Sequence, residues 1–190
     1  MKQEQKYRFT WKNFFRHLHK VNQHRWKVFC LCCRVGIPWQ GLMHDLSKYS
    51  KVEFLEGVKY YQGNYSPIRN AKMDQGYSEA WLHHKGRNKH HYEYWYDYTA
   101  PLETPIMPFR YFLEMICDTF AAGMAYQGKN WTKEYQLSYW NQTKEFAKMH
   151  PSIWNASQKI YEEVAEKGIK DVLKKKHLKR IYENCLKEYQ

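Results

Sequence analysis

Along most of the chain, apolar residues recur at the three- and four-residue spacing of a helix that is buried on one side. The C-terminal segment shows this spacing clearly, in the stripe formed by Leu178, Ile181, Tyr182 and Cys185. Prolines stand between such segments rather than inside them. No segment has the convincing alternation of a half-buried strand, and the aromatic stretch HHYEYWYDYTA also fits a helix. The pattern therefore predicts an all-α fold.

The breaks in this pattern divide the chain into a small number of helices. The expected helices cover residues 9–35, 40–62, 76–98, 107–127, 131–148, 152–167 and 170–188. The stretch QGNYSPIRN has the composition of a loop. A chain of 190 residues can form one sizeable core, and no internal repeat or low-complexity linker divides it. We expect one domain over residues 1–190, a bundle of about six to seven helices.

The composition indicates a folded protein that does not enter a membrane. Hydrophobic residues make up 43% and aromatic residues 18%, which is more than a disordered chain contains. No apolar run reaches transmembrane length, and the start MKQEQKYRFTWKN does not resemble a secretory signal. The five cysteines form neither a disulfide framework nor the two pairs of a zinc ribbon. We expect a soluble, cytoplasmic protein whose thiols are buried in helices.

The formal net charge of +12 attracts polyanions, nucleotides and acidic surfaces without choosing among them. Part of it comes from the C-terminal segment, where KKK and KR can belong to a solvated helix face. The charge makes nucleic acid a candidate partner. The many aromatic residues are compatible with a homodimer.

The stretch GLMHDLSKYS places His44 beside Asp45, with Lys48 about one turn later. His24 precedes it, and Asp118 follows it in the apolar context EMICDTFAAGMAY, where a lone charge is costly to bury. An adjacent imidazole and carboxylate can hold a metal ion, and an ammonium group can neutralise an anionic substrate. An HD dipeptide alone is weak evidence, because a single histidine is more often a surface or hydrogen-bonded core residue. The order of the whole set is what favours a metal site.

Four further histidines lie in the stretch WLHHKGRNKHHYEYW, where an unbroken helix sorts them into two stripes. Residues seven apart lie on nearly the same helix face. One stripe contains His84, Asn88 and His91. The neighbouring stripe contains His83, Arg87 and His90. Arg87 and Asn88 lie between the histidine pairs and are candidate substrate-binding residues.

Gly86 decides whether this helix continues, because glycine weakens a helix by about 1 kcal/mol relative to alanine. If the helix breaks there, the two histidine pairs converge from a loop instead. We favour His84 and His91 as the inward metal ligands, with His83 and His90 as the alternative pair.

Together these side chains suit one or two divalent transition metal ions. Mixed nitrogen and oxygen donors favour manganese, iron, cobalt, nickel or zinc over calcium. The first set contains His24, His44, Asp45 and Asp118. Asp45 can also bridge to a second ion held by the later histidines, and two ions about 3.5–4 Å apart activate water and clamp a phosphate oxygen. Asp45 and Lys48 are therefore the candidate catalytic residues, and Lys48 also the candidate substrate contact.

This ordered set resembles the HD-domain superfamily of metal-dependent phosphohydrolases. Its signature is a histidine on one helix, a His-Asp dipeptide on the next, and a distant aspartate on a later helix. The resemblance matches these positions to His24, to His44 and Asp45, and to Asp118. The segment HDLSK looks like the HD segment with its trailing lysine, which implies that Lys48 contacts phosphate. The paired histidines resemble those of members that bind two metals.

A closer likeness covers roughly residues 20–125, where WQGLMHDLSKYS…EF and AWLHHKGRNKHHYEYW resemble a small bacterial and phage family without a settled function. It implies an HD-like domain with its metal-site core over about 20–125 and a helical extension over about 131–190, in a bacterial or phage-infected cell. The stretch after HHKGRNKHH lacks the Gly-Tyr-Pro signature of cyclic-dinucleotide members. The C-terminal helices align with no counterpart, so the resemblance implies no particular substrate.

The leading hypothesis is a metal-dependent phosphohydrolase that acts on a nucleotide or another small phosphoester. Metal-bound hydroxide would attack phosphorus, while the metals and Lys48 stabilise the developing charge. The resemblance implies an alternative, because some HD-fold proteins use a di-iron pair to activate oxygen and cleave carbon–carbon or carbon–phosphorus bonds. A third hypothesis is a non-catalytic protein that binds nucleic acid or a protein partner through basic residues gathered on one face.

Overall fold

The computed structural model describes residues 7–63 and 65–189, and all regular structure in these ranges is helical. The expected all-α class is confirmed. The α-helices are α1 (Trp11–Arg34), α2 (Pro38–Met43), α3 (Lys51–Lys59), α4 (Pro67–Gln75), α5 (Glu79–Lys85), α6 (Phe109–Gln127), α7 (Tyr135–Thr143), α8 (Pro151–Lys167), α9 (Ile169–Val172) and α10 (Lys175–Lys187). Single 3₁₀ turns form η1 (Leu46–Tyr49), η2 (Tyr92–Trp95), η3 (Gly128–Asn130) and η4 (Lys144–Phe146). Within the described ranges, no helix combines the length and the apolar character needed to cross a lipid bilayer.

The described residues form ten α-helices, more than the six to seven that the periodicity predicts. The expected helix over 40–62 divides into α2, η1 and α3, because Asp45 has a left-handed backbone that cannot continue a helix. The expected helix over 76–98 retains only α5 and η2. Within the segment expected to be a loop, Pro67 occupies the first position of α4, where its fixed φ suits a helix start.

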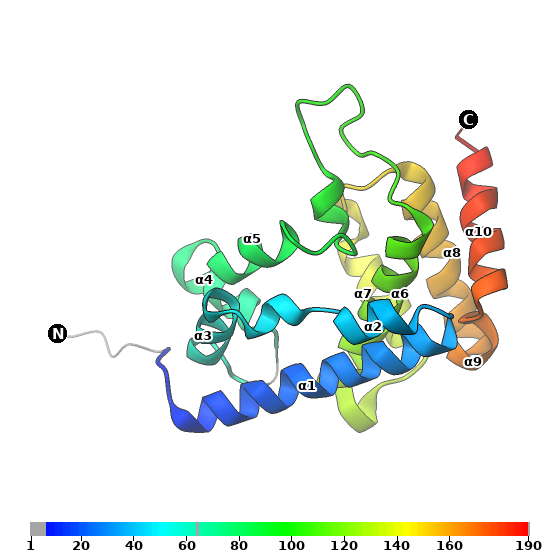
Figure 1. The fold of residues 1–190 in the computed structure, drawn as a ribbon. Coiled ribbons are helices and arrows are strands. Elements are labelled where there is room, and N and C mark those ends of the chain that lie inside the picture. The colour runs from blue at the N-terminus through cyan, green and yellow to red at the C-terminus, as the bar shows by residue number, and fades with distance from the viewer. Residues whose placement is uncertain (1–6, 64, 190) are drawn as a thin grey trace.

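The long helix α1 organises the molecule (Figure 1). Its start is capped by Thr10, whose hydroxyl accepts a hydrogen bond from the backbone N–H of Asn13 at 3.1 Å. α1 packs against α6, α2 and α3. Figure 1 shows α3, α4 and α5 at one end of α1, and α8, α9 and α10 at the other. The middle of α1 therefore faces elements from both halves of the chain.

The apolar stripe predicted on the last helix is confirmed, and it joins the main core. The buried residues of α10 are Leu178, Ile181, Tyr182 and Cys185. They pack with buried residues of α1, α6 and α8. Tyr182 also donates its hydroxyl to the backbone oxygen of Met107 at 2.7 Å, which ties α10 to the segment that leads into α6. This core fixes α6 against α1.

The cysteines are free thiols, and their burial follows the helix faces on which they lie. Cys32, Cys117 and Cys185 are buried in helices, as expected. Cys30 and Cys33 are exposed, which corrects the expectation of buried thiols for these two, because they lie on the outward faces of α1.

Candidate metal centre

Several segments that are far apart in the sequence meet above the middle of α1. His24 comes from α1, and His44 and Asp45 form the turn between α2 and η1. Asp118 comes from α6. The segment from α5 to η2 contributes His84, His90 and His91. All of these residues are buried or half-buried.

The turn at Asp45 has an uncommon backbone conformation. Its φ is 54° and its ψ is 29°, and it is the one non-glycine residue with positive φ among those described. Aspartate is among the few residues that visit this region. Arg25 of α1 stabilises the turn. Its guanidinium donates to the backbone oxygens of His44 and Leu42 at 2.8 Å each. These oxygens lie at the end of α2, where a helix leaves its carbonyl groups without partners.

The first group of possible ligand atoms comes from His24, His44, Asp45 and Asp118, with one atom of each residue within 4.8 Å of the others. Nε2 of His24 lies 3.0 Å from Oδ1 of Asp118 and 3.7 Å from Oδ2 of Asp45. Nε2 of His44 lies 3.2 Å from the same Asp45 oxygen and 3.5 Å from Oδ1 of Asp118. The structure thus brings together the four positions of the ordered motif.

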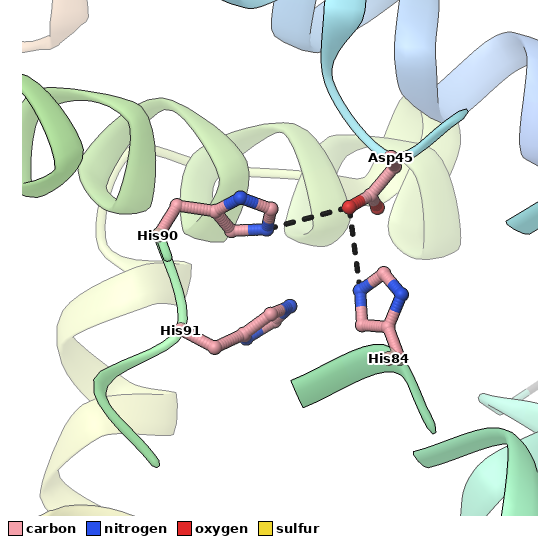
Figure 2. Close-up of side chains that lie close together, drawn as sticks. All are labelled: Asp45, His84, His90 and His91. Carbon is pink, nitrogen blue, oxygen red and sulfur yellow. Dashed lines mark ion pairs between the residues drawn. The ribbon is translucent and has the colours of Figure 1, made fainter. Parts of the chain in front are cut away.

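The second group comes from Asp45, His84, His90 and His91, again with one atom of each residue within 4.8 Å of the others. Figure 2 shows His90 and His91 on one segment, facing Asp45 and His84. Oδ1 of Asp45 lies 3.3 Å from Nε2 of His84 and 3.3 Å from Nε2 of His90. Asp45 therefore directs Oδ2 towards the first group and Oδ1 towards the second.

The late histidines reach the site from a loop, which corrects the expectation of one continuous helix. α5 ends at Lys85, and Gly86 is its C-cap. The backbone N–H of Gly86 bonds to carbonyl groups in the last turn of α5. The seven-residue spacing of His84 and His91 therefore does not place them on one helix face. The structure follows the alternative arrangement, in which the helix breaks at Gly86 and the histidine pairs converge from a loop.

The remaining candidates of this stretch divide between the site and its surroundings. His90, proposed as an alternative ligand, joins the second group, whereas His83 belongs to neither group and bonds through Nδ1 to Oε1 of Glu53 at 2.6 Å. Arg87 is exposed and reaches only the backbone oxygen of His83, at 3.5 Å. Asn88 lies beyond the end of α5, and its amide donates to the backbone oxygen of His84 at 2.8 Å and lies 3.1 Å from Nδ1 of the same residue. Neither Arg87 nor Asn88 lines the cavity beside the donor groups.

Two carboxylates outside these two groups orient three of the histidines, and one of them, Glu114, also forms a third group of possible ligand atoms with His44 and His90. Nδ1 of His44 and Nδ1 of His90 lie 2.9 Å and 3.1 Å from Oε1 of Glu114. Nδ1 of His84 lies 2.7 Å from Oε2 of Glu53. Burial alone would lower the pKa of His44, but the neighbouring carboxylates hold it well above its usual value, so this ring is charged without a metal ion. Once Nε2 loses its proton, an Nδ1–H group that donates to a carboxylate leaves the lone pair on Nε2, the atom that faces the donor groups. Metal-ligating histidines are almost always held in this way.

Neither of these carboxylates was predicted from the sequence. Glu114 lies one helical turn before Asp118, and a second acidic residue at that spacing in an apolar helix was a usable signal. Glu53 gives a weaker signal, because an acidic residue in the first turn of a helix also stabilises the helix dipole.

Several of the buried donor atoms make no hydrogen bond, although most of them lie within ion-pair distance of one another. Within the described residues, the unpartnered buried atoms include Nε2 of His44, His84, His90 and His91 and Oδ1 of Asp45. Each buried polar atom without a partner costs about 1–3 kcal/mol. Burial holds the pKa of His91 well below its usual value, so this ring is neutral. The donor set therefore fits divalent cations, which would bind nitrogen and oxygen atoms that make no hydrogen bond in the protein.

The surrounding charges keep the site carboxylates ionised. Burial alone would raise the pKa of Asp45, but His44 and then Lys48 hold it well below its usual range. Burial would also raise the pKa of Asp118, and the histidines beside it hold it well below its usual range. Hydrogen bonds from two histidines outweigh burial at Glu114 and lower its pKa to about 2. Ionised carboxylates are the form that binds metal.

A cavity of about 610 Å³ opens beside the donor groups, with His24 and Asp118 in its wall. Lys48 also lines it, with Nζ 3.2 Å from Oδ2 of Asp45. Burial alone would lower the pKa of Lys48, but Asp45 and Asp118 raise it above its usual value, so the ammonium group stays charged. Aromatic side chains fill much of the remaining wall, among them Tyr65, Trp81, Tyr126, Tyr135 and Tyr139.

Fold and site define an all-helical protein with a buried cluster of histidine and carboxylate side chains at the edge of a cavity. The chain belongs to the family of unknown function DUF5662, whose model matches residues 13–166. This range contains both donor groups, Lys48, Glu53 and Glu114. No curated protein and no solved structure matches the chain.

Proposed function

We propose that the protein is a metal-dependent phosphohydrolase that acts on a nucleotide or another small phosphoester. The observation that supports this best is the division of Asp45 between the two donor groups, with one oxygen directed towards each. When bound, a pair of divalent ions supplies Lewis acidity, which makes water nucleophilic at neutral pH and neutralises charge on a phosphoryl group. The proposal agrees with the resemblance of the ordered motif to HD-domain proteins.

The two donor groups would hold one ion each. His24, His44 and Asp118 would hold the first ion together with Oδ2 of Asp45. The second ion would be held by Oδ1 of Asp45 with His84, His90 and His91. Nitrogen and oxygen donors in these proportions suit manganese, iron, cobalt, nickel or zinc.

Lys48 and the cavity provide the substrate site of this proposal. Lys48 places an ammonium group in the cavity wall beside the shared carboxylate, where it stabilises negative charge on a phosphoryl group. A cavity of about 610 Å³ lies within the usual size of small-molecule sites. Its aromatic wall can stack on a planar organic group such as a nucleobase.

The test is metal analysis of the purified protein, followed by hydrolysis of a panel of nucleotides and generic phosphodiesters with manganese, iron, cobalt, nickel or zinc. We expect at least one metal-loaded form to hydrolyse a member of the panel. Lys48→Met should lower kcat by about 10²–10³-fold at unchanged metal content, because it removes one stabilising charge. The matched control is Lys51→Met, at an exposed position on α3. A fully metal-loaded protein that hydrolyses nothing in the panel would contradict the proposal.

The composition of the second donor group favours an oxidative function as the second candidate. It combines three histidines with one carboxylate, and such nitrogen-rich donors also suit iron. A di-iron oxygenase would show a mixed-valent paramagnetic signal and oxygen uptake that depends on substrate. Hydrolysis without oxygen consumption would exclude this candidate.

A further inference from the structure

The cavity continues beyond the donor groups along one face of α1. Its wall includes His17, Lys20, Val21 and His24, which are spaced i, i+3, i+4 and i+7. A helix rises about 1.5 Å per residue, so Lys20 lies about 6 Å and His17 about 10 Å from His24 along the axis. The proposed hydrolysis uses the His24 end of this face and leaves the other end without a role.

His17 is a buried histidine without the partner that a structural histidine normally has. It is 8% exposed, and its Nδ1 atom makes no hydrogen bond to any described residue. Its ring packs against Phe54 and Tyr61, with centroid distances of 5.2 Å and 5.7 Å. Gly57 makes room for it, because a Cβ atom there would lie 2.2 Å from Nε2 of His17. The Nδ1 atom is covered by protein atoms, so a ligand in the cavity would reach it after the ring turns. Since buried polar groups are nearly always paired, an imidazole of the cavity wall with an unpaired nitrogen favours a ligand.

Lys20 lies one turn from His17 on the same face and forms no ion pair within the described ranges. Its ammonium group donates to the backbone oxygen of Ala125 at 2.7 Å and to Oε1 of Gln23 at 3.2 Å. The same Nζ atom lies 5.7 Å from the ring centroid of Tyr126. An ammonium group has three hydrogens, so one is not used in these two hydrogen bonds and can be offered to a ligand. Lys48, by contrast, is already paired with Asp45.

The rest of the wall adds positive charge and no free carboxylate at this end. The guanidinium of Arg69 lies over the ring of Tyr65, 4.7 Å from its centroid. Two glutamates also line the cavity, but both are engaged. Glu53 accepts hydrogen bonds from two histidines, and Glu56 accepts from backbone N–H groups at the start of α5, at 3.1 Å and 3.3 Å. The oxygens of both carboxylates are therefore directed at these donors, and Lys20 and Arg69 are the cationic groups of the wall at this end that a ligand anion can contact.

We propose that the cavity binds a phosphoester that carries a second, separate anionic group, with the reacting phosphoryl group at the metal donors and the second group at Lys20 and His17. The assignment of the first end rests on the proposed function. The second end rests on the unpaired cation and the unpaired imidazole. The face of α1 then selects extended compounds whose two anionic groups are about 6–10 Å apart. A phosphate and a carboxylate both present the oxygens that Lys20 would recognise.

The test measures binding to the metal-loaded protein by calorimetry, with three linear phosphonates that resist hydrolysis. They are hexylphosphonate, 6-phosphonohexanoate and hexane-1,6-diylbisphosphonate. At least one of the two probes that carry a second anionic group should bind about tenfold tighter than hexylphosphonate, because it gains a charge-assisted hydrogen bond. The tighter of the two identifies the second group as carboxylate or phosphate. Equal affinities for all three probes would overturn the proposal.

Variants then locate the second group. The affinity ratio compares the probe with two anionic groups with hexylphosphonate, which has one. Lys20→Met and His17→Phe should each bring this ratio close to one, and Lys20→Arg should preserve it. Lys12→Met is the matched control, because Lys12 is exposed on α1 and does not line the cavity. A ratio that Lys20→Met leaves unchanged would overturn the assignment. If circular dichroism shows that Lys20→Met does not fold, the affinity ratio of His17→Phe is compared with that of the wild type instead. An unchanged ratio in His17→Phe would then overturn the assignment.

Hydrolysis of the corresponding phosphate esters separates this proposal from the proposed function. Tighter binding of a probe with two anionic groups, without hydrolysis of any ester, supports the second anion subsite and contradicts the proposed phosphohydrolase function. Hydrolysis of hexyl phosphate and of the bisphosphate at equal kcat/KM, with equal probe affinities, overturns the subsite and supports the phosphohydrolase.

Discussion

Oε1 of Glu114 lies 2.9 Å from Nδ1 of His44, a contact that joins α6 to the turn after α2. The same oxygen lies 3.1 Å from Nδ1 of His90. One carboxylate outside the donor groups thus orients a histidine in each group. Glu53 is the natural comparison, because among the donor residues it orients only His84, at 2.7 Å.

Glu114→Gln should therefore weaken metal binding at both donor groups, and Glu53→Gln at the second group only. The neutral amide removes the charge that fixes each imidazole, a change that typically costs about 10–100-fold in metal affinity. Titration calorimetry with Mn²⁺ or Co²⁺ measures the two sites separately. Glu166→Gln, at an exposed position on α8, should bind as the wild type does. If Glu114→Gln binds metal at both donor groups with the affinities of the wild type, the carboxylate of Glu114 does not orient the ligands.

Asp45→Asn should abolish binding at both donor groups, whereas Asp118→Asn should weaken the first group only. Asn is the appropriate replacement because it tolerates the left-handed backbone at this position. Alanine there would add about 1–2 kcal/mol of backbone strain. A loss of metal binding could then come from a destabilised fold rather than from the missing ligand. Mass spectrometric metal analysis after dialysis gives the stoichiometry. Retention of both ions by Asp45→Asn would refute its role as the shared ligand.

The first donor group follows from sequence because each residue lies on or next to a recognisable helix. His24 and Asp118 lie inside α1 and α6, which the helical spacing predicts within a few residues. The positions of His90 and His91 do not follow in the same way. They depend on whether α5 continues past Gly86, and a preference of about 1 kcal/mol does not decide that against tertiary packing.

The orienting carboxylates are harder still to predict, because their role exists only in the folded structure. Glu53 and Glu114 contact histidines that lie about 30 and 70 positions away in the chain. No local pattern encodes which imidazole each carboxylate meets. The same holds for His17, whose missing partner is visible only after α3 is packed against α1.

The contribution of His17 to the free energy of unfolding should fall as the pH drops below about 6.5. Burial and then the charge of Lys48 lower the pKa of His17 from 6.5 to about 4. The unfolded chain binds a proton in this range that the folded chain does not. The stabilisation from His17, up to about 3 kcal/mol, is therefore complete above pH 6.5 and is lost progressively as the pH falls to about 4.

Urea denaturation of the metal-free protein between pH 4.5 and 7.5 measures this contribution as the difference between wild type and His17→Phe. The other titrating groups are common to both proteins and cancel in the difference. His19→Phe, at an exposed position on the same helix, should keep the wild-type pH dependence. Parallel curves for wild type and His17→Phe would show that His17 titrates normally in the folded protein.

Gly41→Ala should push α2 away from α1 and disturb the turn that carries the shared carboxylate. An added Cβ atom would lie 2.5 Å from Cβ of Cys32 and 3.1 Å from Cα of Phe29, and neither atom is the end of a flexible side chain. Overpacking of this kind costs about 1–3 kcal/mol, and we expect weaker metal binding as well. Leu42→Ala, at a half-exposed position on α2, should change the free energy of unfolding by less than about 0.5 kcal/mol. Urea denaturation and metal titration check both effects. If Gly41→Ala matches the wild type in both, the close approach of the two helices does not position the metal centre.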